Sequence, residues 1–253
     1  MAIARDGTGA TKILWEAVGN GGQVITFTTT ASRHLVVSGE SNSPAVTVAD
    51  SGSGSWTVKS RIMGVGTGVS RVFVAYREGA AAVTTVTVTL SGGTNYGGAK
   101  LDQFTGVKTS GSFESETTAD GTTASATFGS GNHTTTDPNA LVIGAGSGDD
   151  TSTAAWTTTL GSWTELAQDG NATTSLPWQT IYQIAVGSTG PYSLTWNYPP
   201  MNGSYAGVSL LVSFASAVVT PVATYANTPR DDELIALGSV LGPYSWVKPQ
   251  SWF

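Results

Sequence analysis

The chain has 253 residues, of which 11% are charged, and it contains no cysteine. The length fits one large domain or two modest ones, and the absence of cysteine excludes a disulfide framework and any thiolate metal site. A formal net charge of −6 argues against a nucleic-acid partner, because no basic stripe is present to neutralise phosphates.

The first 19 residues argue against a signal peptide. They contain Arg5, Asp6 and Lys12 and no continuous apolar run. No segment of the chain approaches the ~20 apolar residues that a membrane-spanning helix needs. We therefore expect neither a leader nor membrane insertion.

Alternation of β-branched or aromatic residues with polar ones predicts short strands along both halves of the chain. Turn-forming segments rich in Gly, Asn and Ser separate them. In the first half we expect strands at 24–28, 35–37, 45–48, 72–76, 83–90 and 100–104. In the second half we expect them at 124–128, 140–144, 162–166, 179–184, 192–196 and 206–214. The polar stretch 108–123 fits either a linker or a peripheral strand.

Four blocks recur in the same order at an offset of roughly 106 residues. The pairs are 30–39 with 136–145, 54–57 with 161–164, 87–90 with 193–196, and 99–104 with 206–211. The pattern predicts an all-β chain with two tandem antiparallel β-sandwich units, jelly-roll or immunoglobulin-like, over 1–107 and 108–217. The alignment expects Trp56 to overlie Trp163 and Leu35 to overlie Leu141.

Residues 218–253 differ from the repeats. An extended arm is followed by a helix start at Thr228-Pro229, and Gly242-Pro243 ends that helix. The helix carries an apolar face and the residues after it are aromatic. We expect this arm, with its short helix, to make the assembly contact through Leu234, Leu237, Leu241, Tyr244, Trp246, Trp252 and Phe253.

Candidate catalytic and metal-binding residues are few. His34 and His133 have no neighbouring ligand or carboxylate in the sequence, so we interpret them as surface residues at strand edges. Asp149-Asp150 lacks the spaced acids of a calcium loop, and no Gly-x-Ser-x-Gly elbow occurs. The sequence predicts a non-enzymatic protein without cofactor or metal.

Tryptophans are the strongest candidates for contacts. Trp56 and Trp163 occupy matched positions of the repeat and are expected to anchor the cores. Trp156, Trp178 and Tyr205 have no aromatic counterpart in the first half and are placed in or beside loops. They are candidates for contact with a protein partner or for stacking on a glycan.

The chain resembles a family of duplicated β-sandwich proteins of tailed phages, which has relatives in large bacterial surface proteins. The resemblance rests on Ala2-Ile3-Ala4, on 35–37, on Ser55-Trp56-Thr57-Val58 and on 99–107, with counterparts at 138–142 and 161–166, and it covers residues 1–217. It implies a structural role in a virion assembled in the host cytoplasm, as a minor tail or tail-tip protein or a capsid decoration protein. The implied partners are other virion proteins and further copies of the chain.

We also consider two alternative functions. A glycan-binding module that attaches a particle to a cell surface is compatible with the unmatched aromatic residues. A glycan-cleaving enzyme needs two carboxylates ~5–9.5 Å apart in a cleft, and the sequence shows no such pairing.

Overall fold

The structure is a computed structural model that describes residues 2–7, 10, 12–18, 21–63, 70–92, 95–121, 127–148, 161–169, 178–197 and 207–217. The described strands all belong to one compact unit, Met1–Val218. The predicted arm, helix and aromatic tail lie outside the described residues. Every regular element in the described part is a β-strand, and none of it forms a helix long and apolar enough to cross a membrane.

The first half of the larger unit forms one large and one small antiparallel sheet. The large sheet has the order β1-β9-β4-β7-β6, with β2 also paired to β9, and the small sheet has the order β3-β8-β5. The strands are β1 (Ala4–Arg5), β2 (Ile13–Val18), β3 (Gly21–Thr26), β4 (Arg33–Ser41), β5 (Ala45–Asp50), β6 (Thr57–Ile62), β7 (Arg71–Ala80), β8 (Thr85–Ser91) and β9 (Asn95–Thr105).

The second half also forms one large and one small antiparallel sheet. Its large sheet has the order β10-β16-β12-β14-β13, and its small sheet pairs β11 with β15. The strands are β10 (Phe113–Asp120), β11 (Thr127–Gly129), β12 (Leu141–Gly148), β13 (Thr164–Asp169), β14 (Trp178–Ile184), β15 (Thr195–Asn197) and β16 (Gly207–Phe214). The stretch 108–123 therefore supplies a peripheral strand, β10.

The two halves share a set of strand pairings. The orders β9-β4-β7-β6 and β16-β12-β14-β13 run across the large sheets, with β2 beside β9 and β10 beside β16, and the small sheets contain the pairs β3-β8 and β11-β15. These antiparallel pairings form an all-β, sandwich-like architecture. The choice between the jelly-roll and the immunoglobulin-like type stays a prediction.

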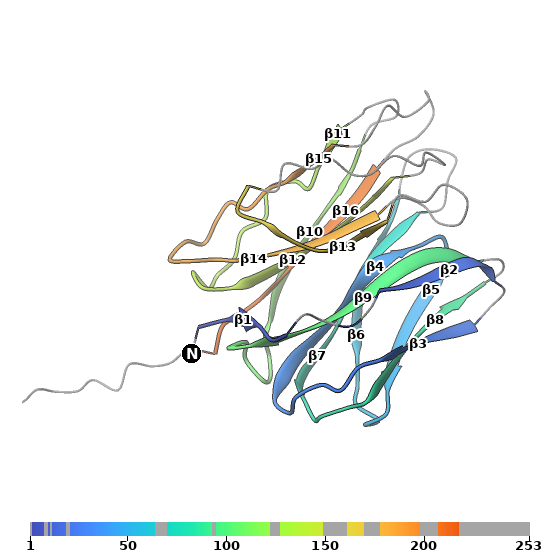
Figure 1. The fold of residues 1–253 in the computed structure, drawn as a ribbon. Coiled ribbons are helices and arrows are strands. Elements are labelled where there is room, and N and C mark those ends of the chain that lie inside the picture. The colour runs from blue at the N-terminus through green and yellow to red at the C-terminus, as the bar shows by residue number, and fades with distance from the viewer. Residues whose placement is uncertain are drawn as a thin grey trace, which may run out of the picture. The chain divides into compact units, whose positions relative to one another are not determined.

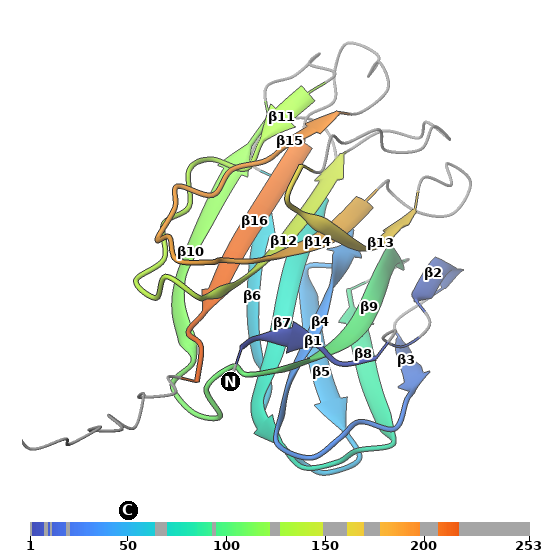
Figure 2. The same ribbon diagram turned by 60° about the vertical axis from the view of Figure 1, so that its left-hand side comes forward.

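The four sheets stack in layers, with the two large sheets face to face in the middle (Figures 1 and 2). One apolar cluster lies within each half, between its large and its small sheet. A third cluster lies between the two large sheets. Its members from the first half include Val36, Val72, Val74, Tyr76 and Phe104, and those from the second half include Leu141, Ile143, Leu210, Val212 and Phe214.

This shared cluster corrects the predicted alignment of the repeats. Leu35 faces the small sheet of its own half, whereas Leu141 faces the other large sheet. The expected overlay of Leu35 on Leu141 is therefore wrong, because the two side chains lie on opposite faces; in a strand, a shift by an odd number of residues has this effect. His34 and Val36 of β4 share the orientation of Leu141.

Trp163 and Trp56 occupy the within-half cores. Trp163 is buried between the sheets of the second half, which confirms its prediction as a core residue. Trp56 is half-buried against the equivalent cluster of the first half, and its Nε1 donates a 2.6 Å hydrogen bond to Oδ2 of Asp50. Both indoles thus pack inside their own sandwich.

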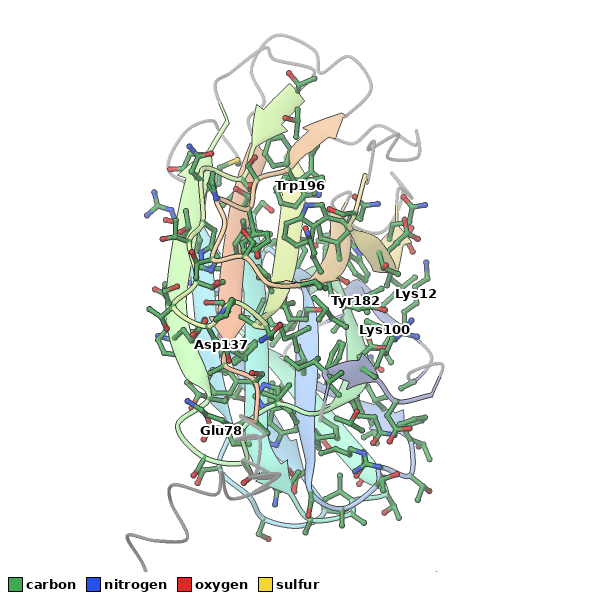
Figure 3. The ribbon with its side chains drawn as sticks, turned by 90° about the vertical axis from the view of Figure 1, so that its left-hand side faces the viewer. Lys12, Glu78, Lys100, Asp137, Tyr182 and Trp196 are labelled. Carbon is green, nitrogen blue, oxygen red and sulfur yellow. The ribbon has the colours of Figure 1, made fainter. Side chains whose placement is uncertain are left out.

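Ion pairs connect the two halves at both margins of the central layers. At one margin, Lys59 and Arg61 of β6 pair with Glu116 and Asp120 of β10, at 3.1 and 2.6 Å. At the other, Lys12 lies beside the second half, and its Nζ is 2.8 Å from Oδ2 of Asp169 at the end of β13 (Figure 3). The two halves therefore share a core and form one compact unit.

The shared core predicts mutual dependence of the two halves. Leu210→Ala removes a fully buried side chain of β16 from the cluster between the large sheets. We expect a loss of about 2–5 kcal/mol in unfolding free energy, the usual range for such a truncation. Urea unfolding followed by far-UV circular dichroism and tryptophan fluorescence should show one transition, shifted to lower urea for both signals.

Val186→Ala provides the matched control, because Val186 is 85% exposed and its truncation should change the unfolding free energy little. Two separate transitions, only one of which moves in Leu210→Ala, would show that the halves unfold independently.

Candidate functional site

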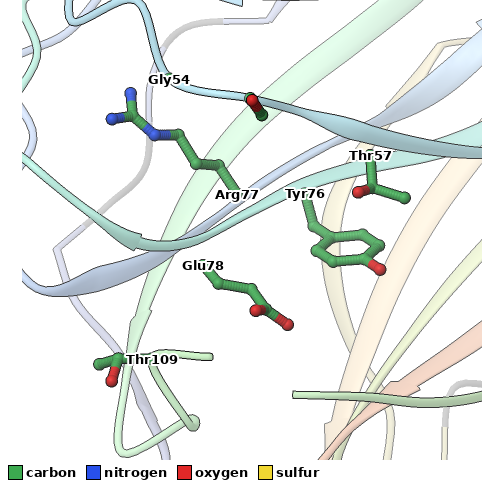
Figure 4. Close-up of a pocket in the computed structure, with 7 residues that line it drawn as sticks. Gly54, Thr57, Tyr76, Arg77, Glu78 and Thr109 are labelled. Atoms are coloured by element: carbon green, nitrogen blue, oxygen red, sulfur yellow. The ribbon is translucent and has the colours of Figure 1, made fainter. Parts of the chain in front are cut away.

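An open pocket of about 450 Å³ lies at the end of the first large sheet where β6 begins and β7 ends (Figure 4). Two charged side chains, Arg77 and Glu78, project from β7. The remaining lining is mostly hydroxyl groups, contributed by the start of β6 and by the loop after β9. The lining residues are Gly54, Ser55, Thr57, Tyr76, Arg77, Glu78 and Thr109.

Glu78 fixes the loop on one side of the pocket. Its Oε1 accepts hydrogen bonds from the backbone N–H and the hydroxyl of Ser112, both at 2.6 Å, and its Oε2 accepts one from the N–H of Gly111 at 2.8 Å. Burial alone would raise the pKa of this carboxyl, but these hydrogen bonds outweigh it and lower the pKa below its ordinary value. Glu78 is therefore an ionised anchor for residues 111–112.

Arg77 is similarly occupied. Its guanidinium pairs with Asp50, whose carboxylate also accepts hydrogen bonds from Trp56 and from the N–H of Gly52. Burial raises the pKa of Asp50, but the hydrogen bond from Arg77 and those from its other donors lower it by more. Gly54 leaves room for this arrangement, because a Cβ there would overlap the guanidinium of Arg77.

These contacts limit the chemistry of the pocket. Glu78 and Arg77 are both engaged by other residues, so the groups that the lining presents to a ligand are mainly hydroxyls. Among the described lining residues, Glu78 is the one carboxylate and none is a histidine. Such a surface can exchange hydrogen bonds with an uncharged polar ligand. Within the described ranges, no group of three or more His, Cys, Asp or Glu residues is placed to hold a metal ion.

His34 lies behind the pocket, in the core between the two large sheets, and not at a surface edge as the sequence suggested. It is 2% exposed, and its ring centroid lies 5.7 Å from that of Tyr76 and 4.5 Å from that of Phe214. Neither ring nitrogen has a hydrogen-bond partner. Burial lowers the pKa of His34 to about 4, and the nearby charge of Glu78 opposes that shift only partly.

His133 is also buried, so its prediction as a surface residue is wrong as well. Its Nδ1 lies 2.9 Å from the hydroxyl oxygen of Thr117, and its backbone exchanges two hydrogen bonds with Tyr192. Burial lowers its pKa. The second half covers this ring with β10, an element that the sequence pattern left undecided between linker and strand.

Of the three residues predicted to contact a partner or a glycan, the structure describes one, Trp178. Trp178 begins β14 and is fully buried, packed so closely on Gly98 of β9 that a Cβ at Gly98 would lie 2.3 Å from the indole. Its assignment as a surface contact for a glycan or partner is therefore wrong. Trp156 and Tyr205 lie outside the described residues, as does the whole assembly set from Leu234 to Phe253.

The sequence analysis did not single out the pocket. Ser55 and Thr57 fall within a repeated block, but only the fold brings them beside Glu78 and Thr109. Comparison of the chain with protein-family models, with curated proteins and with solved structures gave no match.

The burial of His34 predicts acid sensitivity. Its folded-state pKa of about 4 lies below the ordinary 6.5, so the unfolded chain binds the proton first as the pH falls. Stability present above pH ~6.5 is therefore lost progressively between pH ~6.5 and ~4, by about 3 kcal/mol for a shift of this size. The unfolding free energy of the wild type and of His34→Phe should be measured across this window.

His34→Phe keeps an aromatic ring in the core and removes the titration, so the difference between the two proteins isolates His34. The comparison is needed because burial raises the pKa of Asp102 to about 6, a shift whose effect on stability has the opposite sign. Equal pH dependence in both proteins would contradict the assignment.

Proposed function

We propose that the chain is a non-enzymatic structural protein of a tailed-phage virion, either a minor tail or tail-tip protein or, alternatively, a capsid decoration protein. The proposal rests first on the sequence resemblance of residues 1–217. The observation that supports it best in the structure is the stack of four β-layers with an apolar cluster between each pair of neighbouring layers. The jelly roll, one of the two sandwich types that the sequence predicts, recurs in viral capsid proteins.

The pocket is consistent with a binding or structural role. Glu78 and Arg77, its charged groups, are engaged by Ser112, Gly111 and Asp50. General acid–base or nucleophilic chemistry requires a group whose proton or lone pair is available to a substrate. The described lining offers hydroxyl groups instead.

Glycan binding is the second candidate, and the hydroxyl-rich pocket is the feature that favours it. Trp178 no longer supports this function because it is buried. Attachment to a cell-surface glycan is compatible with a position in the virion. This function is tested on a glycan array with the full chain and with Thr57→Tyr, whose larger side chain fills the pocket. Binding by the full chain that is lost in Thr57→Tyr would indicate an attachment module. No binding by either would indicate a purely structural part.

The virion assignment is tested on particles. Antibodies raised against residues 1–217 should label purified phage in electron micrographs at one defined location, the tail tip for a minor tail protein or the capsid shell for a decoration protein. The protein should also be detected by mass spectrometry of particles purified through a density gradient. Its absence from purified particles, with the protein present in the infected-cell lysate, would overturn the proposal.

We further propose that residues 218–253 make the assembly contact. The described members of the three apolar clusters lie within residues 3–214. We expect that deleting 218–253 leaves the sandwiches folded with nearly unchanged melting. Incorporation of the truncated chain into particles should be lost when it complements a phage that lacks the protein. A full-length chain with Leu234, Leu237 and Leu241 changed to Ala should show the same defect. Normal incorporation of the truncated chain would rule this role out.

A further inference from the structure

Most sheet edges in the described part of the chain carry a feature that hinders pairing with another strand. Charged side chains, register shifts, proline and shortness serve this purpose in β-proteins. β6 carries Lys59 and Arg61. β2, β10 and β13 each have a register shift, and β1, β11 and β15 are two or three residues long. β5 directly follows Pro44 and ends on Asp50.

β3 is the exception. Its residues Gly21–Thr26 contain no charge and no proline, and all six pair with β8 in one unbroken register. In the described residues no strand pairs with its other side. Figure 2 shows β3 at the margin of the small sheet, next to β8.

Hydrogen-bond parity shows which groups of β3 face outward. The N–H of Phe27 donates to the carbonyl of Thr84 just beyond the strand, so residues of odd number point their backbone groups toward β8. The N–H and C=O groups of Gly22, Val24 and Thr26 therefore point away from the sheet. These three residues form a regular row of donors and acceptors along the free edge.

The side chains support pairing at this edge. Ile25 is 2% exposed and anchors β3 in the core of its half, whereas Val24 is 53% exposed on the opposite face. The neighbouring outward residues of β8 are Thr85, Thr87 and Thr89. An added strand would thus extend a flat, uncharged surface without moving the core.

We propose that β3 is a self-association edge that pairs antiparallel with β3 of a second copy of the chain, with Val24 opposite the partner's Val24. In this register Gly22 faces the partner's Thr26, and the missing side chain of Gly22 accommodates that threonine. The alternating pattern gives about six hydrogen bonds between the two edges. The product is a continuous six-stranded sheet, β5-β8-β3-β3-β8-β5.

Self-pairing is favoured over a different partner because this register is self-complementary. Two copies that each carry a formal charge of −6 repel, yet β3 brings no like charges together. A single pair of six-residue edges is small beside the ~1,200–2,000 Å² of a stable interface, so the free chain should associate weakly. Copies held near each other in an assembly would pair far more completely.

Sedimentation equilibrium of the full chain over a wide concentration range tests the proposal. The weight-average mass should rise from 25.9 kDa toward twice that value as concentration increases. Val24→Pro removes an outward N–H without breaking a bond to β8, and it should stay monomeric at concentrations where the wild type is half dimeric. Val24→Lys, at the same exposed position, should do the same through charge repulsion.

Ile62→Lys is the matched control, because Ile62 is 44% exposed on the edge strand β6 and should not affect association. Amide exchange adds an independent reading in the wild type: the N–H groups of Val24 and Thr26 should become protected as concentration rises. A wild-type chain that stays monomeric up to ~1 mM would overturn the proposal. So would a Val24→Pro variant that folds and dimerises like the wild type.

Discussion

The packing of the two large sheets against each other is the interaction on which the rest of the structure depends. It buries the second face of β4, β12 and β16, whose residues are buried along almost their whole length. Without this contact, apolar side chains of both large sheets would face water. They include Val36, Val74 and Phe104 in the first half and Leu141, Leu210 and Val212 in the second. Burial of that apolar area therefore stabilises both halves together and makes them one unit.

The same interface contains ionisable groups, and their burial favours the uncharged protonation state. His34 fits between Tyr76 and Phe214 as a neutral ring, because its nitrogens have no partner to stabilise a charge. Asp102 is held by Arg5, but its desolvation still raises the pKa of the carboxyl. Ionisable groups in a desolvated layer connect the stability of the interface to pH, whereas the ion pairs at its margins depend mainly on ionic strength.

Charge is scarce in this chain, and much of it is used within the molecule. At least six of the 11 Lys and Arg residues form ion pairs with carboxylates. Hydroxyls, apolar side chains and backbone groups are therefore important candidates for contacts with other molecules. The pocket beside Glu78 presents hydroxyl groups, and the edge of β3 presents an apolar side chain and backbone groups.

The sequence by itself determined the all-β class, the position of most strands and the core role of Trp163. Alternation and turn residues are local signals, and each strand carries them independently of its neighbours. Only the tertiary structure decided which face each central strand presents to which sheet. In β4 and β12 both faces are buried, so burial does not alternate along the strand and the misalignment of Leu35 with Leu141 leaves no trace in the sequence. Three further features follow from the tertiary structure. They are the burial of His34 and Trp178, the pocket that brings Ser55 near Glu78, and the free edge of β3. They depend on contacts between residues far apart in the chain, which no local pattern records.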